Sequence, residues 1–285
     1  ALCEAAERLA GALTPWLEKW RADENAALAT WMCRGNSWYC VFCAASRLQV
    51  PLVALSRDLP DKAVELQRNR EILAAHRPAV VVADSCAEFK DTGLEELYYS
   101  LASGSVVEFP TLWARAQCEG RVAPEVETSA DATLCYCYTG GTTKASRCAR
   151  TSHRMALHEV AAYRHIADLG RKDRILQQHS LYWAASAYGE VDIALAYGCA
   201  LVFCEAWDVD GLVSAIRANE VTCSGLVPSL LAAIEPRDVP SLQLVFTWGE
   251  ALQPHVAREW ARQVHLVDLL ISTECWLSLY ADWSR

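Results

Sequence analysis

The sequence has no cluster of lysine and arginine and no long apolar run. Its 285 residues carry 26 basic and 35 acidic side chains, which gives a formal net charge of −9. An acidic chain without a basic patch is poorly suited to bind nucleic acid or an anionic membrane surface. No apolar run reaches the roughly 18 residues that a membrane-spanning helix requires. We therefore expect no nucleic-acid partner and no membrane span.

Three common signatures of nucleotide-binding proteins and hydrolases are also missing. The chain lacks the GxxxxGK[ST] spacing of a P-loop and the GxGxxG fingerprint of dinucleotide-binding folds. It lacks the GxSxG elbow of an α/β-hydrolase as well, and no Ser, His and Asp stand in a recognisable catalytic order. A hydrolase with a serine or cysteine nucleophile is therefore disfavoured.

Cysteine is abundant but irregularly spaced. The odd total of thirteen, behind a charged and helix-like N-terminal segment (residues 1–12), favours free thiols in a reducing compartment and a cytoplasmic location. Cys135 and Cys137 alternate along an apolar segment, so we expect both thiols in the core rather than on a metal. Cys40 and Cys43 form a CxxC pair inside an apolar, helix-like run, which favours packing over a zinc or redox role.

Apolar periodicity predicts an α/β fold in which βαβ sheets form layers with packed helices. Residues 79–83 are a continuous β-branched run, typical of a parallel strand that is buried on both faces. Residues 84–130 have the weakest pattern, so we expect a first subdomain over 1–130 and a second over 131–285. Expected helices lie at 2–20, 37–48, 61–76, 152–165, 185–197, 208–219, 228–234 and 254–263, and expected strands at 26–32, 50–55, 79–83, 132–138, 174–179, 200–204, 221–225, 242–247 and 267–271.

A loop rich in glycine and threonine follows the apolar run 132–138 and is the most informative segment. Glycines let backbone N–H groups approach an anion, threonine hydroxyls add donors, and nearby cations neutralise phosphate charge. We interpret this segment as a polyphosphate-holding loop between a strand and a helix. The alternative is a hairpin turn with incidental threonines. The loop consists of Thr139, Gly140, Gly141, Thr142 and Thr143, and it is followed by Lys144 and Arg147.

These residues resemble the Y-T-S-G-T-T-G-x-P-K-G phosphate loop of the adenylate-forming (AMP-binding) superfamily, which includes acyl-CoA synthetases and nonribosomal peptide adenylation domains. Residues 248–252 (WGEAL) are similar to the family's G-G-E-A-L motif, and residues 268–274 (DLLISTE) to its N-x-Y-G-x-T-E motif. Three motifs in family order are more specific than any one alone. The resemblance covers nearly the whole chain and implies the α/β fold of the family's large N-terminal subdomain.

The resemblance implies ATP-dependent activation of a carboxylic acid to an acyl-adenylate, which coenzyme A or the pantetheine thiol of an acyl carrier protein then captures. It assigns the loop residues 139–143, with Lys144 and Arg147, to the ATP phosphates. Gly249, Glu250 and Ala251 are assigned to the adenine side, Thr273 to the α-phosphate, and Glu274 to Mg²⁺, which prefers carboxylate oxygens. The alternative for Glu274 is a solvated acid at the start of a helix.

The same resemblance suggests a pocket for the acid. Trp183 falls where the family has an aromatic or histidine gate, and the alternative is aromatic packing in the core. His179 lies nearby, and we interpret it as a structural histidine rather than a base. Ala184 stands near the position of the aspartate that binds an α-amino group, which argues against an α-amino acid substrate. The candidate pocket residues are Trp183, Ala184, Ser186, Tyr188 and Trp248.

The chain also departs from the family pattern. Lys144 replaces a glycine, which stiffens the loop, and Leu270 replaces a tyrosine that stacks on adenine. The family's ribose-binding Y-x-T-G-D motif and its C-terminal lid have no counterpart before Arg285. We therefore expect a fragment, a truncated chain or a degenerate relative. The second hypothesis is a non-catalytic nucleotide- or acyl-binding module that serves as a partner surface.

Overall fold

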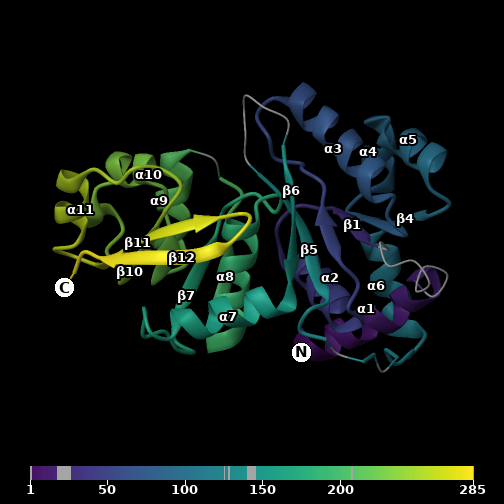
Figure 1. Cartoon of the computed structure of the whole chain (residues 1–285), viewed down its shortest axis with the longest axis horizontal. Coiled ribbons are helices and arrows are strands. Elements are labelled where there is room, and N and C mark those ends of the chain that lie inside the picture. The colour runs from purple at the N-terminus through teal and green to yellow at the C-terminus, as the bar shows by residue number, and fades with distance from the viewer. Residues whose placement is uncertain are drawn as a thin grey trace. The chain divides into compact units, whose positions relative to one another are not determined.

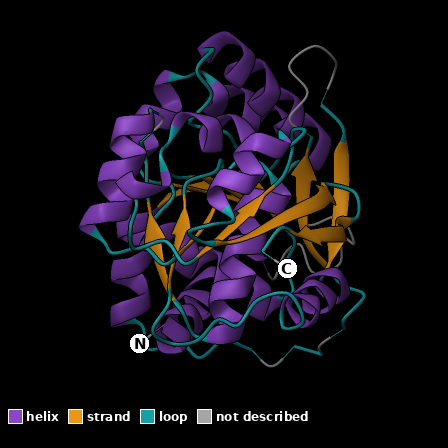
Figure 2. Ribbon diagram, turned by 90° about the vertical axis from the view of Figure 1, so that its left-hand side faces the viewer, coloured by secondary structure: helices purple, strands orange, loops and turns teal. Residues whose placement is uncertain are grey.

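The structure is a computed structural model that describes residues 2–17, 27–124, 126–127, 129–139, 146–206 and 208–284. Of residues 184–188 it describes the backbone alone. The chain forms two compact units, Ala1–His153 and Arg154–Arg285. Each unit contains a six-stranded sheet with its own topology, and helices lie on both sides of the strands (Figure 2). This layered arrangement confirms the predicted α/β fold class.

The sheet of the first unit has the strand order β4-β3-β1-β2-β5-β6. All of its strands run parallel except β6, which pairs antiparallel with β5. Every residue of β1, β2 and β3 is buried, as helices on both faces of a parallel sheet require. The strands are β1 (Leu28–Trp31), β2 (Leu52–Ala54), β3 (Val80–Ala83), β4 (Ser105–Glu108), β5 (Thr133–Tyr138) and β6 (Cys148–Ser152).

Local sequence signals explain where the helices of the first unit begin and end. The carboxylate of Asp61 accepts hydrogen bonds from two backbone N–H groups in the first turn of α3. Arg77 closes the same helix in a left-handed conformation, directly before Pro78. The helices are α1 (Leu2–Leu17), α2 (Asn36–Leu48), α3 (Lys62–His76), α4 (Cys86–Asp91), α5 (Leu94–Leu101) and α6 (Phe109–Cys118).

The strand that follows the Gly/Thr loop was not expected. The sequence suggests the order strand, loop and helix. In the structure the loop instead joins two strands, β5 before it and β6 after it, which lie side by side (Figure 1). The two strands pair antiparallel, with Tyr138 opposite Cys148. Because β5 also pairs with β2, both strands belong to the first sheet. The division between the units therefore falls after His153, and the expected boundary at 130/131 lies inside the first unit.

The sheet of the second unit has the order β12-β11-β10-β9-β7-β8. Five strands are parallel, and β12 pairs antiparallel with β11 at one edge, which the sequence pattern did not indicate. The strands are β7 (Arg174–Gln177), β8 (Ala200–Phe203), β9 (Cys223–Gly225), β10 (Leu244–Thr247), β11 (His265–Ser272) and β12 (Trp276–Asp282). The helices are α7 (His153–Tyr163), α8 (Ala184–Tyr197), α9 (Val209–Ala218), α10 (Pro228–Ala233) and α11 (Pro254–Trp260), with a 3₁₀ turn at Pro236–Asp238.

Two other expectations concern cysteine and the membrane. All thirteen cysteines lie in the described part of the chain, and each is a thiol outside any disulfide. Cys135 and Cys137 are buried with their sulfur atoms 3.3 Å apart, which confirms that both thiols face the core from one side of β5. Within the described part of the chain, none of the helices combines the length and the apolar character that a membrane crossing needs.

Candidate functional site

A groove of about 610 Å³ lies in the second unit, where β11 extends past the end of β10. Thr247, the last residue of β10, is level with Asp268, so residues 269–272 of β11 continue beyond β10 and pair with β12. Ligands of parallel sheets bind outside the carboxyl ends of the strands, which is where this groove opens. Its walls are Gly249, Glu250, Ala251, Asp268, Leu269, Leu270, Ile271, Leu279, Tyr280 and Ala281.

The groove joins two of the motifs that the sequence singled out. Gly249, Glu250 and Ala251 form the turn after β10, and Gly249 has φ of 85°, a conformation that suits glycine. Across the groove, the 268–271 segment belongs to β11. The groove therefore brings together the three predicted adenine-side residues and residues 268–271 of the third motif, whereas Thr273 and Glu274 are absent from its lining.

The surface of the groove is largely apolar. Leu270 and Leu279 lie directly opposite each other on β11 and β12, and their exposed fractions are 61% and 66%. Tyr280, exposed to 47%, is also a wall residue of the groove. It pairs with Leu269, so its side chain leaves the strand on the face opposite to that of Leu270 and Leu279. Leu270 lacks the ring face that the family motif supplies. Sequence reasoning missed Tyr280 because it did not predict β12.

Glu250 has a definite structural role at the wall of the groove. Its carboxylate accepts hydrogen bonds from the backbone N–H of Ser229 at 3.0 Å and from the Ser229 hydroxyl at 3.1 Å. Ser229 lies in the first turn of α10, where free N–H groups favour an acidic partner. The carboxylate therefore ties the turn after β10 to α10 and holds one wall of the groove in place.

Thr273 and Glu274 lie in the turn that joins β11 to β12. The alternative interpretation of Glu274 as a helix-start acid is wrong, because the segment is a hairpin turn. Glu274 is exposed. Among the described residues, no group of three or more His, Cys, Asp or Glu side chains is arranged to hold a metal ion.

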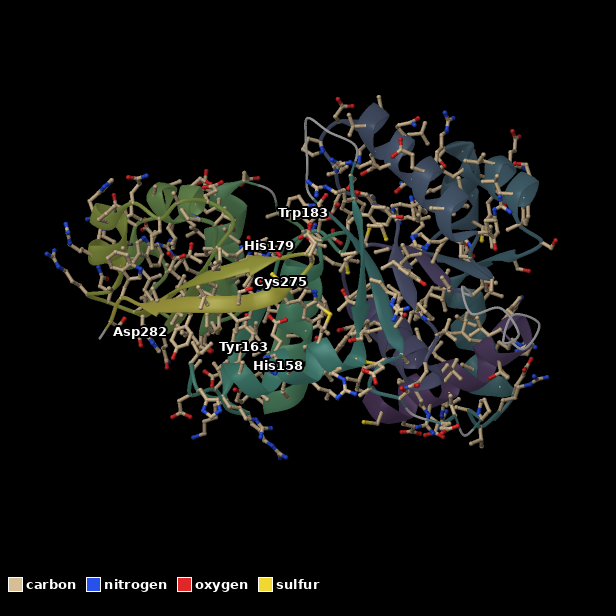
Figure 3. All side chains as sticks on the ribbon, viewed as in Figure 1. His158, Tyr163, His179, Trp183, Cys275 and Asp282 are labelled. Atoms are coloured by element: carbon tan, nitrogen blue, oxygen red, sulfur yellow. The ribbon has the colours of Figure 1, made fainter. Side chains whose placement is uncertain are left out.

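Cys275, which follows Glu274, is a further polar group at this turn that the sequence analysis did not single out. Its sulfur lies 3.0 Å from the hydroxyl of Ser272 and 3.1 Å from that of Ser278. These two hydrogen bonds lower the pKa of the exposed thiol. The turn therefore presents the Glu274 carboxylate and the acidified thiol of Cys275 to solvent. Figure 3 labels Cys275.

A second, much smaller cavity of about 10 Å³ lies inside the second unit. The buried indole of Trp248 forms one wall, and a Cβ atom at Gly225 would overlap its ring. The remaining wall residues come from α7, α8 and the strands between them. The lining is Tyr163, Ile175, Gly189, Glu190, Ile193, Cys223, Gly225, Phe246 and Trp248.

The predicted pocket residues have different outcomes. Trp248 lines the small cavity. Trp183 precedes the first turn of α8 and is absent from that lining. The side chains of Ala184, Ser186 and Tyr188 lie outside the described part of the structure. Only one of the five residues is therefore placed on a cavity by the described coordinates.

Three buried carboxyl groups of α7 and α8 were missed in the sequence analysis: Glu190 lines this cavity, whereas Glu159 and Asp192 are absent from its lining. Glu190 lies in the cavity wall, and its Oε1 is 3.1 Å from Nδ1 of His179. Glu159, exposed to 3%, has its pKa raised by burial to about 7, while a hydrogen bond with Tyr163 opposes that rise. Burial raises the pKa of Asp192 well above its usual value, and the charge of Glu159 adds to this rise.

Several atoms of this carboxyl group cluster have no hydrogen-bond partner among the described atoms. They are Oε2 of Glu159, Oδ2 of Asp192 and Nε2 of His179. The Nδ1 contact with Glu190 and an aromatic contact with Trp248, 5.2 Å between ring centres, are consistent with the expected structural role of His179. Figure 3 labels His179 and Tyr163 in this part of the second unit.

The Gly/Thr loop is described at its two ends, while Gly140, Gly141, Thr142, Thr143 and Lys144 lie outside the described residues. The backbone N–H of Thr139 donates to the carbonyl of Arg147 at 2.9 Å. In return, the backbone N–H of Arg147 donates to the Thr139 hydroxyl at 3.0 Å. The two ends of the loop are thus locked together in the first unit, and Arg147 is exposed.

A half-buried histidine supports the base of the same loop. Nε2 of His76 lies 2.7 Å from the hydroxyl of Tyr138, the last residue of β5. The thiol of Cys148, the first residue of β6, is 3.8 Å from the same nitrogen. Burial lowers the pKa of His76 to about 4, so the imidazole is neutral at physiological pH. This contact joins α3 to both strands that carry the loop.

Comparisons with known proteins agree with this arrangement. A family model described as AMP-binding enzyme matches residues 1–284. Nonribosomal peptide synthetase 8 of Aspergillus fumigatus is 26% identical over 189 residues, which cover 66% of this chain and 2% of that protein. The chain therefore spans a small part of this curated relative.

Two solved structures show the same fold. ATP-bound MatB from Rhodopseudomonas palustris has a TM-score of 0.81 and 16% identity, covering 100% of this chain and 56% of MatB. The N-terminal subdomain of NpsA from Klebsiella oxytoca, in complex with 3-hydroxyanthranilyl-AMSN, has a TM-score of 0.77 and 18% identity, covering 99% of this chain and 68% of that one. Because the family model extends over nearly every residue, the chain belongs to the AMP-binding enzyme family.

Proposed function

We propose that this chain is the large nucleotide- and acid-binding part of an enzyme that activates a carboxylic acid with ATP. The acid's carboxylate attacks the α-phosphorus of ATP and forms a new bond from its oxygen to that phosphorus. The bond between the α-phosphorus and the oxygen that bridges to the β-phosphate breaks. Pyrophosphate leaves, and the product is an acyl-adenylate. The observation that carries the proposal is the 610 Å³ groove, which joins Gly249–Ala251 to the third motif at the carboxyl edge of a parallel sheet.

The groove is suited to the adenine ring. Leu270 and Leu279 offer exposed apolar surface, which favours a planar base over a sugar or a phosphate. Glu250 fixes the opposite wall through Ser229. The ATP-bound state of the MatB structure supports ATP as the nucleotide.

Phosphate and metal contacts come from the other predicted residues. Thr139–Thr143, Lys144 and Arg147 would bind the ATP phosphates, and Thr273 would bind the α-phosphate. Mg²⁺ commonly binds one or two carboxylates together with substrate phosphates rather than a cage of protein ligands. The single exposed carboxylate of Glu274 fits that requirement. The bound ion would neutralise charge on the phosphates as pyrophosphate leaves.

The acid and the acceptor are assigned on the same basis. The Trp248 cavity would receive the acid, because the family resemblance assigns Trp248 to the acid pocket and Trp248 lines this cavity. Similarity to nonribosomal peptide synthetases supports a pantetheine thiol on a carrier protein as acceptor, and coenzyme A is the alternative.

Nucleotide binding by the intact protein tests the proposal. We expect calorimetry to show ATP binding that strengthens with Mg²⁺, and Glu274→Gln to weaken the Mg²⁺-dependent binding by about tenfold or more, the loss of one charge-assisted contact. Binding of AMP without metal stays unchanged. Glu205→Gln, which removes an exposed carboxylate that lines neither cavity, is the matched control and leaves both affinities unchanged.

Turnover separates the two hypotheses for the intact protein. Release of pyrophosphate with a panel of carboxylic acids establishes the enzyme. Binding of ATP or of an acyl-adenylate analogue without release supports the alternative, a degenerate binding module that serves as a partner surface. Failure to bind either ligand contradicts both.

A further inference from the structure

Trp248 occupies the space in which a larger substrate would lie. Its side chain is 8% exposed, and its indole rests directly on the backbone of Gly225 in β9. The remaining cavity, about 10 Å³, has room for one water-sized or methyl-sized group. Ile175, Ile193 and Phe246 form apolar walls of this space, and Glu190 is a polar residue of the same lining.

We propose that Trp248 restricts the acid to a short one, with about one or two carbons beyond its carboxyl group. The inference rests on the proposed function, because it takes the Trp248 cavity as the place of the acid. The methyl or methylene end of the acid contacts the indole and the backbone of Gly225. Longer aliphatic and aromatic acids meet the indole and are rejected.

The cavity has little freedom to widen. On one side of the indole, Gly225 has no side chain, and its backbone belongs to a strand that pairs with β7 and β10. On another side, the ring of His179 lies 5.2 Å away between centres and is tied to Glu190. Behind the cavity, Tyr163 and Phe246 pack edge to face at 5.3 Å. Displacing the indole therefore requires changes in several packed neighbours, and well-packed interiors resist such changes.

Acyl-adenylate analogues test the restriction by tail length. The intact protein is titrated with 5′-O-sulfamoyladenosine carrying an acetyl, propionyl, hexanoyl or benzoyl tail. We expect the acetyl and propionyl analogues to bind similarly and the two larger ones about tenfold to a hundredfold more weakly. In Trp248→Ala the large analogues gain at least that much affinity, because apolar cavities of about 150 Å³ accept benzene-sized groups.

Two further variants keep the test decisive. Trp248→Leu opens less space than Trp248→Ala and preserves apolar packing. We expect this variant to bind the hexanoyl analogue, and it replaces Trp248→Ala in the test if that variant does not fold. Trp283→Leu, the same substitution outside the cavity, leaves tail preference unchanged. Equal binding of acetyl and hexanoyl analogues by the unmodified protein overturns the inference and leaves the proposed function standing. Failure of every analogue to bind overturns the proposed function and the inference with it.

Discussion

The two units differ in how they accommodate buried polar groups. In the first unit, Asn69 is almost fully buried, and both ends of its amide are bonded to the backbone of Ser56. Oδ1 accepts from the Ser56 N–H at 2.8 Å, and Nδ2 donates to the Ser56 carbonyl at 2.7 Å. Glu65 on the same helix is buried as well, and it accepts from the N–H of Leu59 at 2.7 Å. These groups hold the segment after β2 against α3.

In the second unit, two buried acids, Glu159 and Asp192, are matched less completely. Oε2 of Glu159 and Oδ2 of Asp192 have no hydrogen-bond partner among the described atoms, and burial raises the pKa of both groups. A buried polar group that supports a fold is bonded within it, and an unmatched one costs stability. The comparison teaches that buried Asn69 and Glu65 stabilise the first unit, whereas buried Glu159 and Asp192 lower the stability of the second.

The largest expected effect on stability comes from replacing Asn69, whose buried amide is hydrogen-bonded at both ends in the first unit. Asn69→Leu keeps the side-chain volume but leaves the N–H and C=O of Ser56 buried without partners. We expect the free energy of unfolding to fall by about 2–5 kcal/mol, since each unsatisfied group costs about 1–3 kcal/mol. Urea unfolding of the intact protein measures the change.

Asn219→Ala is the matched control for that substitution. Asn219 also donates its amide to a backbone carbonyl, that of Ala215 at 2.9 Å, but it is exposed. Water replaces the lost bond, so we expect a change within about 0.5 kcal/mol. Equal losses for the two variants would show that burial does not set the value of these bonds, and the comparison between the units would lose its basis.

The unmatched acid of the second unit is expected to respond in the opposite direction. The pKa of Glu159 is 4.5 in its ordinary state and about 7 in the fold. Above pH 4.5 the unfolded chain has released a proton that the folded chain retains, so stability falls as pH rises and the full loss is present above about pH 7. That loss reaches up to about 3 kcal/mol. Glu159→Gln removes it, so the variant is more stable than the parent at pH 8 and its stability is less dependent on pH between 5 and 8.

Glu65→Gln supplies the contrast from the first unit. The Glu65 carboxylate accepts from Leu59 N–H and lies 3.1 Å from Nζ of Lys62. Loss of its charge weakens charge-assisted bonds, so we expect this variant to lose about 1 kcal/mol at pH 8. Urea unfolding at pH 5 and pH 8 compares the two variants. A loss of stability in both at pH 8 would remove the distinction between matched and unmatched acids.

Much of the fold was accessible from the sequence where local signals are strong. The β-branched run at 79–83 became β3, and Asp61 and Pro78 bracket α3 as capping rules predict. The missed elements are short or depend on partners. α4 has six residues, and β6 has the largely exposed sequence CARTS, which becomes a strand because it pairs with β5. Pairing across a sheet edge is a tertiary interaction that periodicity does not report.

The candidate site divides in the same way. Gly249–Ala251 could be found because the residues of that motif are contiguous, and the structure places them on a groove. The exposed Tyr280 could not, since it belongs to the unpredicted strand β12. Glu159 and Asp192 are 33 positions apart in the sequence, and they interact because α7 and α8 pack together. In the sequence alone, each has the pattern of an ordinary polar residue on a helix. Sequence motifs identify sites whose residues are close in the chain, and packing determines the rest.

The smallest expected effect tests whether an exposed ion pair contributes to the free energy of unfolding. In the first unit, Nη2 of Arg57 is 2.8 Å from Oε2 of Glu88, whose side chain is 62% exposed. Arg57 also contacts Asp84 at 2.9 Å and lies over the ring of Trp31, so its position does not depend on Glu88. We expect Glu88→Ala to cost less than about 1 kcal/mol, and less again in high salt, because exposed ion pairs are weak and screened.

Asp84→Ala is the partner experiment, because Asp84 binds the same arginine and also accepts from the backbone N–H of Cys33 at 2.6 Å. Its side chain is about half as exposed as that of Glu88, at 32%. We expect a loss of about 1–3 kcal/mol with little dependence on salt, measured by urea unfolding at low and high ionic strength. If Glu88→Ala costs as much as Asp84→Ala, neither the burial nor the number of these bonds sets their contribution to stability. The unmatched acids Glu159 and Asp192 would then carry a smaller penalty than their burial implies.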